Sequence, residues 1–377
     1  MPFGEEHIED GVGLSLSGGG YRAVLFHTGA LWRINELGVL SQLSRVSSVS
    51  GGAIVAGLLA VRWPKLVFDG HNIATNFVDE VVTPLRTFCS SGIDVASIIG
   101  GTFNPFRTIG EQVAHEYRER LGLGVRLCDL AEQPGAPGQP RFVFNSTNYA
   151  TGSSFRFSQP YAGDYRLGLI PHPTFDVATA VACSSAFPPV LAPIELDVDP
   201  QMFEQTKGAD LWEHKDFRRR LPLADGGVYD NLGLETVWKR FTTVLVSDAG
   251  KPFEVDAGIG SLAPKQILRV MDIALNQALA LRKRVIIDAF KHGQRGSYWG
   301  IDTPIADYRT DSLAVRPEKI RELSAIRTRL DRFQESEQCE LINWGYAVCD
   351  AALHSHAPQL IKVQAPHAWP YERFGLA

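Results

Sequence analysis

Two short stretches near the amino terminus have the residue types of an acyl-transfer site. Gly18-Gly19-Gly20 would present backbone N–H groups without side-chain cover, and Ser48-Val49-Ser50-Gly51-Gly52 would expose a serine hydroxyl at a sharp turn. N–H groups aimed at a developing oxyanion, followed by an exposed nucleophile, are the two halves of such a site. What remains to be found is the base that takes the proton of Ser50.

The stretch around Ser50 resembles a G-x-S-x-G nucleophile elbow, with Ser48 in place of the first glycine. Small residues are needed on both sides because the chain folds tightly from a strand back into a helix. The Gly51 N–H, at the positive end of that helix, can also donate to an oxyanion. Taken alone, these residues fit an ordinary helix-capping serine better, because such serines are common.

The glycine run allows a second interpretation, a dinucleotide-binding turn, because Gly18, Gly20 and Ala23 fit the pattern G-x-G-x-x-A. That fold requires an acidic residue at the end of its second strand. Here the second expected strand ends in Ser50-Gly51-Gly52, with no Asp or Glu. The sequence therefore favours acyl transfer over nucleotide binding.

Asp225 is the best candidate for the base. Two glycines follow it, so we expect its carboxylate to sit in an open turn with little steric cover. A plain Asp-Gly turn is the alternative for this stretch taken alone. None of the ten histidines lies in a recognisable catalytic context, and we interpret His27 as a packed residue of the helix after the glycine run.

The elements that must position these residues can be predicted from hydrophobic periodicity. Residues 13–16 alternate as a short buried strand, and 21–37 have one apolar helical face. Residues 45–49 form the next strand, and 53–61 are apolar all round, which is typical of a core helix. Strand, helix and strand in this order make a βαβ unit, which builds a parallel sheet.

Further along, the sequence predicts more strands and helices without an internal repeat. The expected elements are a hairpin of strands at 141–148 and 154–157, a small-residue helix at 176–185, a charged surface excursion at 199–220, a turn at 223–231, a buried strand at 242–247, and helices at 264–290, 320–332 and 337–353.

Two stretches of the sequence each allow two interpretations. Ile93 to Ile109 is rich in Gly, Phe, Ile and Pro with almost no charge, which fits a packed loop or an apolar lid facing lipid. Arg218-Arg219-Arg220 fits a solvated face, with attraction to phosphate or lipid head groups as the alternative. Residues 131–140 are expected to form a surface linker.

Composition limits the class of protein. The 377 residues are 45% hydrophobic and 21% charged, with a net charge of -5, which is ordinary for a globular protein and gives no basic field for nucleic acid. Five scattered cysteines without a C-x-x-C pair argue against disulfides or structural zinc and favour a reducing compartment. No secretory signal or membrane-spanning apolar run is visible, so we expect a cytoplasmic location.

Three motifs in this order make the chain resemble the patatin-like phospholipases, lipid acyl hydrolases that use a serine–aspartate dyad without histidine. They are Gly18-Gly19-Gly20-Tyr21-Arg22, Ser48-Val49-Ser50-Gly51-Gly52 and Asp225-Gly226-Gly227. The strand at 142–145 and the small-residue helix that ends in Ser184-Ser185-Ala186-Phe187-Pro188-Pro189 support the resemblance, which covers roughly residues 12–250. The departure is Ser48, where many members have glycine.

The resemblance implies an α/β fold of three layers, α/β/α, with a central and mostly parallel sheet flanked by helices. It implies a single domain over residues 1–377, with a motif-bearing core at about 12–250 and a helical C-terminal part at about 264–355. The oligomeric state is left open.

The resemblance also implies the roles of the site residues. Ser50 would be the nucleophile, Asp225 the base and Arg22 a support for the glycine loop or for negative charge. The oxyanion hole would be formed by Gly18, Gly19, Gly20 and Gly51. No cofactor or metal would be needed.

The implied partner is a phospholipid or another acyl ester, with peripheral contact at a membrane surface. Two alternatives remain open from the sequence. One is a non-catalytic lipid-binding protein on the same scaffold, and the other is a thioesterase or small-ester hydrolase.

Overall fold

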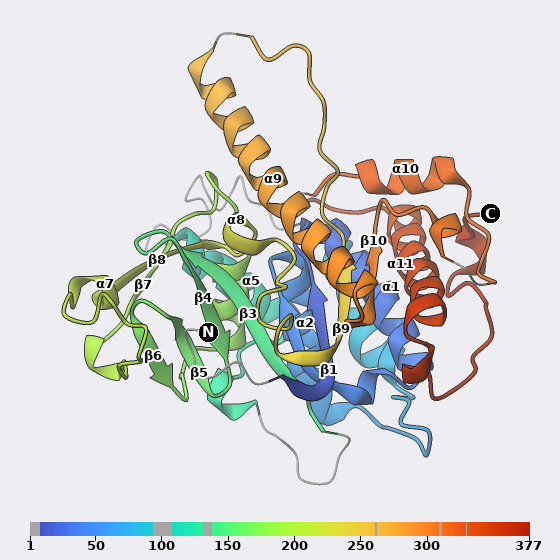
Figure 1. Cartoon of the computed structure of the whole chain (residues 1–377), viewed down its shortest axis with the longest axis horizontal. Coiled ribbons are helices and arrows are strands. Elements are labelled where there is room, and N and C mark those ends of the chain that lie inside the picture. Colours follow the sequence, from blue (N-terminus) through green and yellow to red (C-terminus); the bar gives the residue numbers. More distant parts are fainter. Residues whose placement is uncertain (1–7, 93–107, 131–137, 261, 309–310, 329) are drawn as a thin grey trace.

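A ten-stranded sheet with helices on both faces forms the centre of the protein (Figure 1). Its main path runs in the order β10-β9-β1-β2-β3-β4-β5-β6, and β7 and β8 attach to it through β3. This confirms the predicted α/β class. The computed structural model describes residues 8–92, 108–130, 138–260, 262–308, 311–328 and 330–377.

The part of the sheet that carries the glycine run and the serine elbow is parallel. It consists of β1 (Glu9–Leu16), β2 (Leu43–Ser48), β3 (Arg141–Asn148), β9 (Phe241–Asp248) and β10 (Arg295–Gly300). The predicted βαβ unit is therefore confirmed. Because the carboxyl ends of parallel strands meet at one edge, the loops that follow these strands are brought together there.

Beyond β3 the sheet becomes antiparallel, so the whole sheet is mixed. β3 pairs with β4 (Ser153–Ser158), as the predicted hairpin requires, and β5 (Tyr161–Asp164) and β6 (Gly168–Pro171) extend it. β8 (Arg220–Asp225) pairs antiparallel with both β3 and β7 (Ile194–Asp197). The sequence did not indicate the four-residue strands β5, β6 and β7, which are too short to show a periodic pattern.

Most helices cover one face of the sheet and enclose the larger hydrophobic core. The most extensive packing between two helices is that of α1 against α11. The helices of this group are α1 (Gly20–Glu36), α2 (Gly51–Arg62), α3 (Thr83–Cys89), α5 (Ile109–Leu121), α6 (Val177–Ser184), α10 (Pro317–Ala325) and α11 (Glu335–His356). This core contains residues of both α1 and α11, which are far apart in the sequence, and the single domain stays a prediction.

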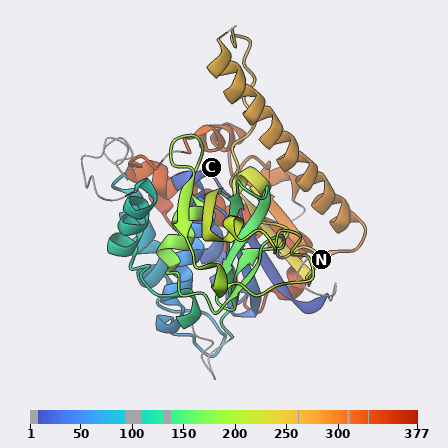
Figure 2. The same cartoon turned by 90° about the vertical axis from the view of Figure 1, so that its left-hand side faces the viewer.

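A smaller core lies on the opposite face, beneath α9 (Ala263–Lys291). The alternation of side chains along β9 shows the two faces: Leu245 belongs to the larger core, whereas Val244 and Val246 belong to the smaller one. Ile286 is the buried residue of α9 in this core, and the amino-terminal part of the helix projects away from the body (Figures 1 and 2).

Two predicted elements differ from the structure. The expected turn at 223–231 is the end of β8 followed by the short helix α8 (Gly227–Asp230). The helix expected at 320–332 ends as α10 at Ala325, because Ile326 is extended with a ψ of 144°. The second difference coincides with contacts between the chain after α10 and the glycine loop.

The arginine triplet is not simply a solvated face. Arg218 is buried, its guanidinium lies 3.8 Å from the centre of the Trp212 ring, and it donates to the Trp212 carbonyl oxygen. Arg220 forms an ion pair with Glu195 across the β7–β8 pair. The short helix α7 (Asp216–Arg219) turns Arg218 inward, a geometry that charge alone does not indicate.

Several expectations concern residues that are only partly described. Residues 93–107 of the apolar stretch and 131–137 of the linker lie outside the described residues. All five cysteines are free thiols. Within the described ranges, no helix is long and apolar enough to cross a membrane, and no group of three or more His, Cys, Asp or Glu side chains could hold a metal ion.

Candidate active site

Ser50 occupies a strained elbow between β2 and α2. Its φ of 52° and ψ of -118° lie outside the regions that residues with a Cβ normally adopt. The elbow leaves no room for larger neighbours, since a Cβ on Gly52 would lie 2.5 Å from the Leu16 carbonyl oxygen. Its strain is held by surrounding contacts, and the half-buried Ser50 side chain is presented at the carboxyl edge of the parallel strands.

Hydrogen bonds from α6 and β3 fix this elbow. The Ser50 N–H donates to the Ser184 hydroxyl at 3.0 Å, and that hydroxyl donates to the Asn145 carbonyl oxygen at 2.7 Å. The Asn145 side-chain amide donates to the Ser48 carbonyl oxygen at 2.9 Å. Ser184 and Asn145 thus position Ser50 from two other elements.

The register of β3 explains why Asp225 meets Ser50. β2 ends with Ser48 opposite Phe144, and β8 arrives from the other direction and ends with Asp225 opposite Ser146. The two strands therefore lie end to end along the same side of β3. The elbow after β2 and the carboxylate at the end of β8 converge in the gap between them.

Asp225 lies in a buried position rather than in the open turn that its two following glycines suggested. Its residue is 2% exposed, and its Oδ1 accepts a hydrogen bond from the Gly227 N–H at 2.7 Å. Burial raises the pKa of the Asp225 carboxyl to about 6, while hydrogen bonds from the Gly227 N–H and the Ser50 side chain act in the lowering direction. A carboxylate of raised basicity in contact with a serine hydroxyl is suited to accept its proton.

The glycine run lies directly against the elbow. Gly19 and Gly20 have φ values of 146° and 58°, which favour glycine. A Cβ on Gly51 would lie 2.2 Å from the Gly20 carbonyl oxygen, and one on Gly18 would lie 3.3 Å from Cβ of Ser50. Close approach of the two loops therefore depends on the missing side chains.

Backbone N–H groups of this region differ in their availability. Gly20 begins α1 and Gly51 begins α2, and N–H groups in the first turn of a helix have no partner within the helix. The Gly18 N–H, in contrast, donates to the Asn231 carbonyl oxygen at 3.0 Å. That bond occupies the donor, so Gly18 does not fit the expected oxyanion hole, and its lack of a side chain allows the close approach to Ser50 instead.

Arg22 supports the glycine loop from behind. Its fully buried guanidinium donates to the carbonyl oxygens of Ser324 at 2.6 Å, Ile326 at 2.9 Å and Ala249 at 2.8 Å. Burial lowers the pKa of Arg22 to about 10. Of the two roles considered for this arginine, these contacts favour support of the loop over direct stabilisation of negative charge.

We expect Arg22→Lys to lower the free energy of unfolding by about 2–4 kcal/mol, because a lysine ammonium cannot reach three carbonyls spread around a planar guanidinium. Urea denaturation measures this change. Arg62→Lys is the matched control, since Arg62 forms a partly exposed pair with Glu80 and should change stability by less than about 1 kcal/mol. Equal stability of the two variants would contradict the role given to Arg22.

A segment near the C-terminus closes over the same loop. A Cβ on Gly20 would lie 1.4 Å from the Thr328 carbonyl oxygen, so the chain after α10 crosses the glycine loop in direct contact. This contact and the bond from Arg22 explain why α10 stops at Ala325. No sequence signal could have revealed it, because more than three hundred residues separate the two segments (Gly20 and Thr328).

His27 is a structural residue, as the sequence predicted. It is fully buried, with Nε2 2.9 Å from the Ser17 carbonyl oxygen and Nδ1 2.8 Å from the Ser247 hydroxyl. Because a carbonyl oxygen only accepts, Nε2 carries the proton and Nδ1 accepts from Ser247. Burial lowers the pKa of His27 to about 4, and the neutral ring links the glycine loop to β9.

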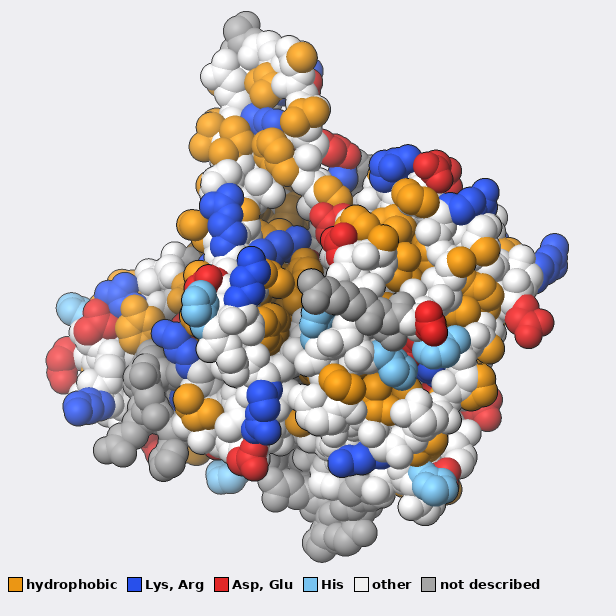
Figure 3. Space-filling view, turned by 45° about the vertical axis from the view of Figure 1, so that its right-hand side comes forward, with side chains coloured by type: hydrophobic (Ala, Val, Ile, Leu, Met, Phe, Trp, Pro, Cys, Tyr) orange, Lys and Arg blue, Asp and Glu red, His pale blue; other side chains and the backbone are white. Residues whose placement is uncertain are grey.

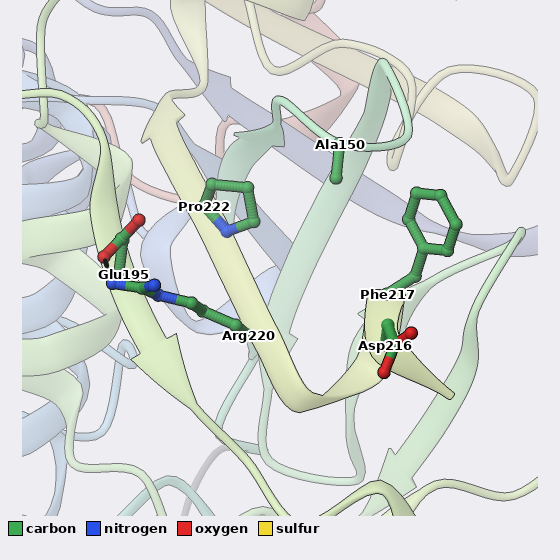
Figure 4. Close-up of a pocket in the computed structure, with 6 residues that line it drawn as sticks. All are labelled: Ala150, Glu195, Asp216, Phe217, Arg220 and Pro222. Atoms are coloured by element: carbon green, nitrogen blue, oxygen red, sulfur yellow. Dashed lines mark hydrogen bonds and ion pairs between the residues drawn. The ribbon is translucent and has the colours of Figure 1, made fainter. Parts of the chain in front are cut away.

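A surface hollow lies on another part of the molecule, between the β3–β4 turn and the β7–β8 pair (Figure 4). Its lining combines apolar surface with the Arg220–Glu195 ion pair. The lining residues are Ala150, Glu195, Asp216, Phe217, Arg220 and Pro222. Since this set includes neither Ser50 nor Asp225, we do not assign the hollow to the candidate active site.

The chain matches the model of a known protein family. The family model described as patatin-like phospholipase matches residues 14–238, which include all three motifs. A search of curated proteins by sequence found no match.

Solved structures of a human protein share the fold at low sequence identity. Human GIVD cytosolic phospholipase A2 matches with a TM-score of 0.56 and 12% identity, over 94% of this chain and 60% of that chain. The same human protein in complex with methyl γ-linolenyl fluorophosphonate gives 0.52 and 15%, over 94% and 59%. VipD from Legionella pneumophila matches with a TM-score of 0.40 and 14% identity, over 94% and 68%. This chain thus spans about 60% of the length of the human protein.

Proposed function

The chain belongs to the patatin-like phospholipase family, and on that premise we propose that it is a lipid acyl hydrolase in which Ser50 and Asp225 carry the reaction. The observation that supports this most strongly is the end-to-end meeting of β2 and β8, which brings the Ser50 hydroxyl into hydrogen-bonding contact with the buried Asp225 carboxylate. The substrate class is a carboxylic ester of a lipid, with a phospholipid as the first candidate.

In the first half of the proposed reaction, the Ser50 oxygen attacks the ester carbonyl carbon while its proton passes to the Asp225 carboxylate. The carbonyl oxygen becomes an oxyanion, which the N–H groups of Gly19, Gly20 and Gly51 at the start of α1 and α2 would stabilise. Asp225 then gives the proton to the leaving alcohol oxygen. The alcohol departs, and the acyl group remains esterified to Ser50.

In the second half, a water molecule attacks the acyl carbonyl carbon and transfers a proton to Asp225. The same N–H groups hold the second oxyanion. When this intermediate collapses, the Ser50 oxygen takes the proton back from Asp225 and the carboxylic acid is released. Typical mutational costs of about 3–4 kcal/mol for one oxyanion donor set the scale of the glycine-loop contribution.

The non-catalytic alternative is less well supported by the geometry. A lipid-binding scaffold without turnover has no need of a strained Ser50 or of a buried Asp225 carboxyl whose pKa is raised to about 6. A thioesterase or small-ester hydrolase would use the same residues. A panel of phospholipid, thioester and short nitrophenyl ester substrates separates these two enzyme classes by their relative kcat/KM.

Labelling with a fluorophosphonate tests the proposed nucleophile directly. The human structural relative was solved with a fluorophosphonate, methyl γ-linolenyl fluorophosphonate, and such reagents react with activated serine hydroxyls. We expect mass spectrometry to find the adduct on Ser50 in the native protein and none after heat denaturation. An adduct on another serine, or no adduct under conditions that label a control serine esterase, would overturn the assignment.

A further inference from the structure

Asn231 lies where three loops of the candidate active site meet. Its backbone carbonyl oxygen accepts the Gly18 N–H at 3.0 Å, and its half-buried side chain lies against the backbone of Gly18, Gly227 and Gly250. Within the part of the chain that the structure describes, its side-chain amide forms no hydrogen bond. A polar group left unpaired beside a nucleophile is available to a molecule that enters the site.

Contacts at two glycines place the side-chain oxygen of Asn231 between Ser50 and Asp225. A Cβ on Gly18 would lie 2.3 Å from Asn231 Oδ1 and 3.3 Å from Ser50 Cβ. A Cβ on Gly227 would lie 2.7 Å from Asn231 Oδ1 and 3.0 Å from Asp225 Oδ1. The two side-chain oxygens are therefore no further apart than about two hydrogen-bond lengths. A single molecule that donates two hydrogen bonds can bridge them.

The surroundings of the Asn231 nitrogen favour this orientation of the amide. A Cβ on Gly250 would lie 3.3 Å from Asn231 Nδ2 and 2.9 Å from Asp248 Oδ1, so the nitrogen is on the side of the buried Asp248 carboxylate. An N–H group facing a carboxylate is favourable, whereas a carbonyl oxygen in the same place would be repelled. The oxygen is thus left facing Ser50 and Asp225.

Water and alcohols, which can both attack an acyl-enzyme, differ in the number of their protons. A water molecule has two O–H groups, so it can give one proton to Asp225 while the other O–H donates to Asn231 Oδ1. An alcohol has one O–H, whose proton Asp225 must take during attack, and nothing remains to donate to Asn231. Oδ1 therefore favours water over an alcohol as the attacking molecule.

We propose that Asn231 Oδ1 binds the attacking water and directs the acyl group to water rather than to alcohols. This inference rests on the proposed function and deepens its second half. The water oxygen forms a bond to the acyl carbonyl carbon, one proton passes to Asp225, and the second O–H keeps its hydrogen bond to Asn231. When the bond from the carbonyl carbon to the Ser50 oxygen breaks, that oxygen takes the proton from Asp225. The second proton leaves in the hydroxyl group of the carboxylic acid.

Competition between water and methanol tests this role. With a short nitrophenyl ester in buffer that contains methanol, the acyl-enzyme yields free acid and methyl ester, and chromatography measures their ratio. Asn231→Leu keeps a side chain of similar shape against the glycines but removes the acceptor oxygen. We expect the ratio of methyl ester to acid to rise about 10-fold, because attack by water loses a hydrogen bond and attack by methanol loses none. The ratio does not depend on the amount of folded enzyme.

Kinetics and control variants separate this role from a structural one. In Asn231→Leu the acyl group should accumulate on Ser50 in quenched reactions, while the rate of fluorophosphonate labelling stays within about 3-fold. Asn231→Asp keeps an oxygen at the same place and should return the product ratio to within about 3-fold of the native value. Asn276→Leu makes the same exchange at a half-buried asparagine of α9, the helix that projects from the body in Figure 3, and should leave the ratio unchanged.

The outcomes distinguish this inference from the proposed function. A native product ratio in Asn231→Leu, or an equal rise in Asn276→Leu or Asn231→Asp, would overturn the role of Asn231. If Asn231→Leu does not fold, Asn231→Ala removes the same oxygen without adding apolar bulk and must give the same rise. Native protein that cleaves esters and is labelled on Ser50 would then still support the proposed function. Native protein that does neither would end both.

Discussion

Ser50→Ala is expected to abolish hydrolysis of a short nitrophenyl ester, with kcat lowered by at least about 10⁴-fold. The reason is that the acyl-enzyme cannot form without the hydroxyl, and the glycine N–H groups alone retain only the residual catalysis of an oxyanion hole. Initial rates with matched protein concentrations measure the effect. Circular dichroism of the variant should be unchanged, because alanine removes only one half-buried oxygen from the elbow.

A matched substitution at the same position separates catalysis from strain. Ser50→Gly should be as inactive as Ser50→Ala but more stable, because glycine adopts a φ of 52° and a ψ of -118° without the penalty that a Cβ incurs. We expect a difference of about 1 kcal/mol or more in the free energy of unfolding between the two variants. Turnover near the native rate in either variant would refute the assignment of Ser50 as the nucleophile. Equal stability of the two variants would show that the Ser50 backbone is not strained.

Asp225→Asn is expected to lower kcat by at least about 10³-fold, since an amide cannot accept the Ser50 proton. The native enzyme should also lose activity as the pH falls through about 6, because burial raises the pKa of Asp225 to about that value and the protonated form is no base. The pH profile of kcat/KM for a neutral ester measures this limb. A profile that stays flat down to pH 4 would contradict Asp225 as the base.

The same substitution should make the protein more stable at neutral pH. The folded-state pKa of Asp225 is raised from 3.8 to about 6, so its favourable contribution, from the neutral form, is complete below 3.8 and is lost as the pH rises through 6. Above that pH the buried charge costs about 3 kcal/mol at most. Thermal unfolding at pH 8 and pH 4 should show Asp225→Asn more stable than the native protein at the higher pH, with a smaller difference at the lower.

Asp164 is a matched control for assigning the pH dependence of kcat/KM to Asp225, because it is a buried aspartate whose pKa is also raised by burial. It accepts hydrogen bonds from Asn148 and Thr151 and from the N–H groups of Arg166 and Leu167 in the β5–β6 region. Asp164→Asn should disturb that turn and lower stability while the pH limb of kcat/KM stays near 6. Such a result would assign the limb to Asp225 and not to buried carboxyl groups in general.

Local sequence patterns predicted the elements that carry the motifs because those elements are long or strongly periodic. The strand at 141–148 and the βαβ unit around the glycine run follow from period-two and period-3.6 apolar spacing. The short strands β5, β6 and β7 could not be predicted in this way. They exist through pairing with neighbours distant in the sequence, and four residues carry too little pattern to reveal that pairing.

The sequence by itself determined which residue types the candidate site contains: a small-residue elbow around Ser50, a run of glycines, and an aspartate followed by two glycines. Only the tertiary structure decided where these groups lie relative to one another, which of them are buried, and which N–H groups are already bonded. The register of β3 brings Asp225 to Ser50, burial raises its basicity, Asn231 occupies the Gly18 N–H, and Arg22 ties the loop to the chain after α10. Residue types and turns are local properties, whereas burial and strand register depend on contacts between segments far apart in the chain.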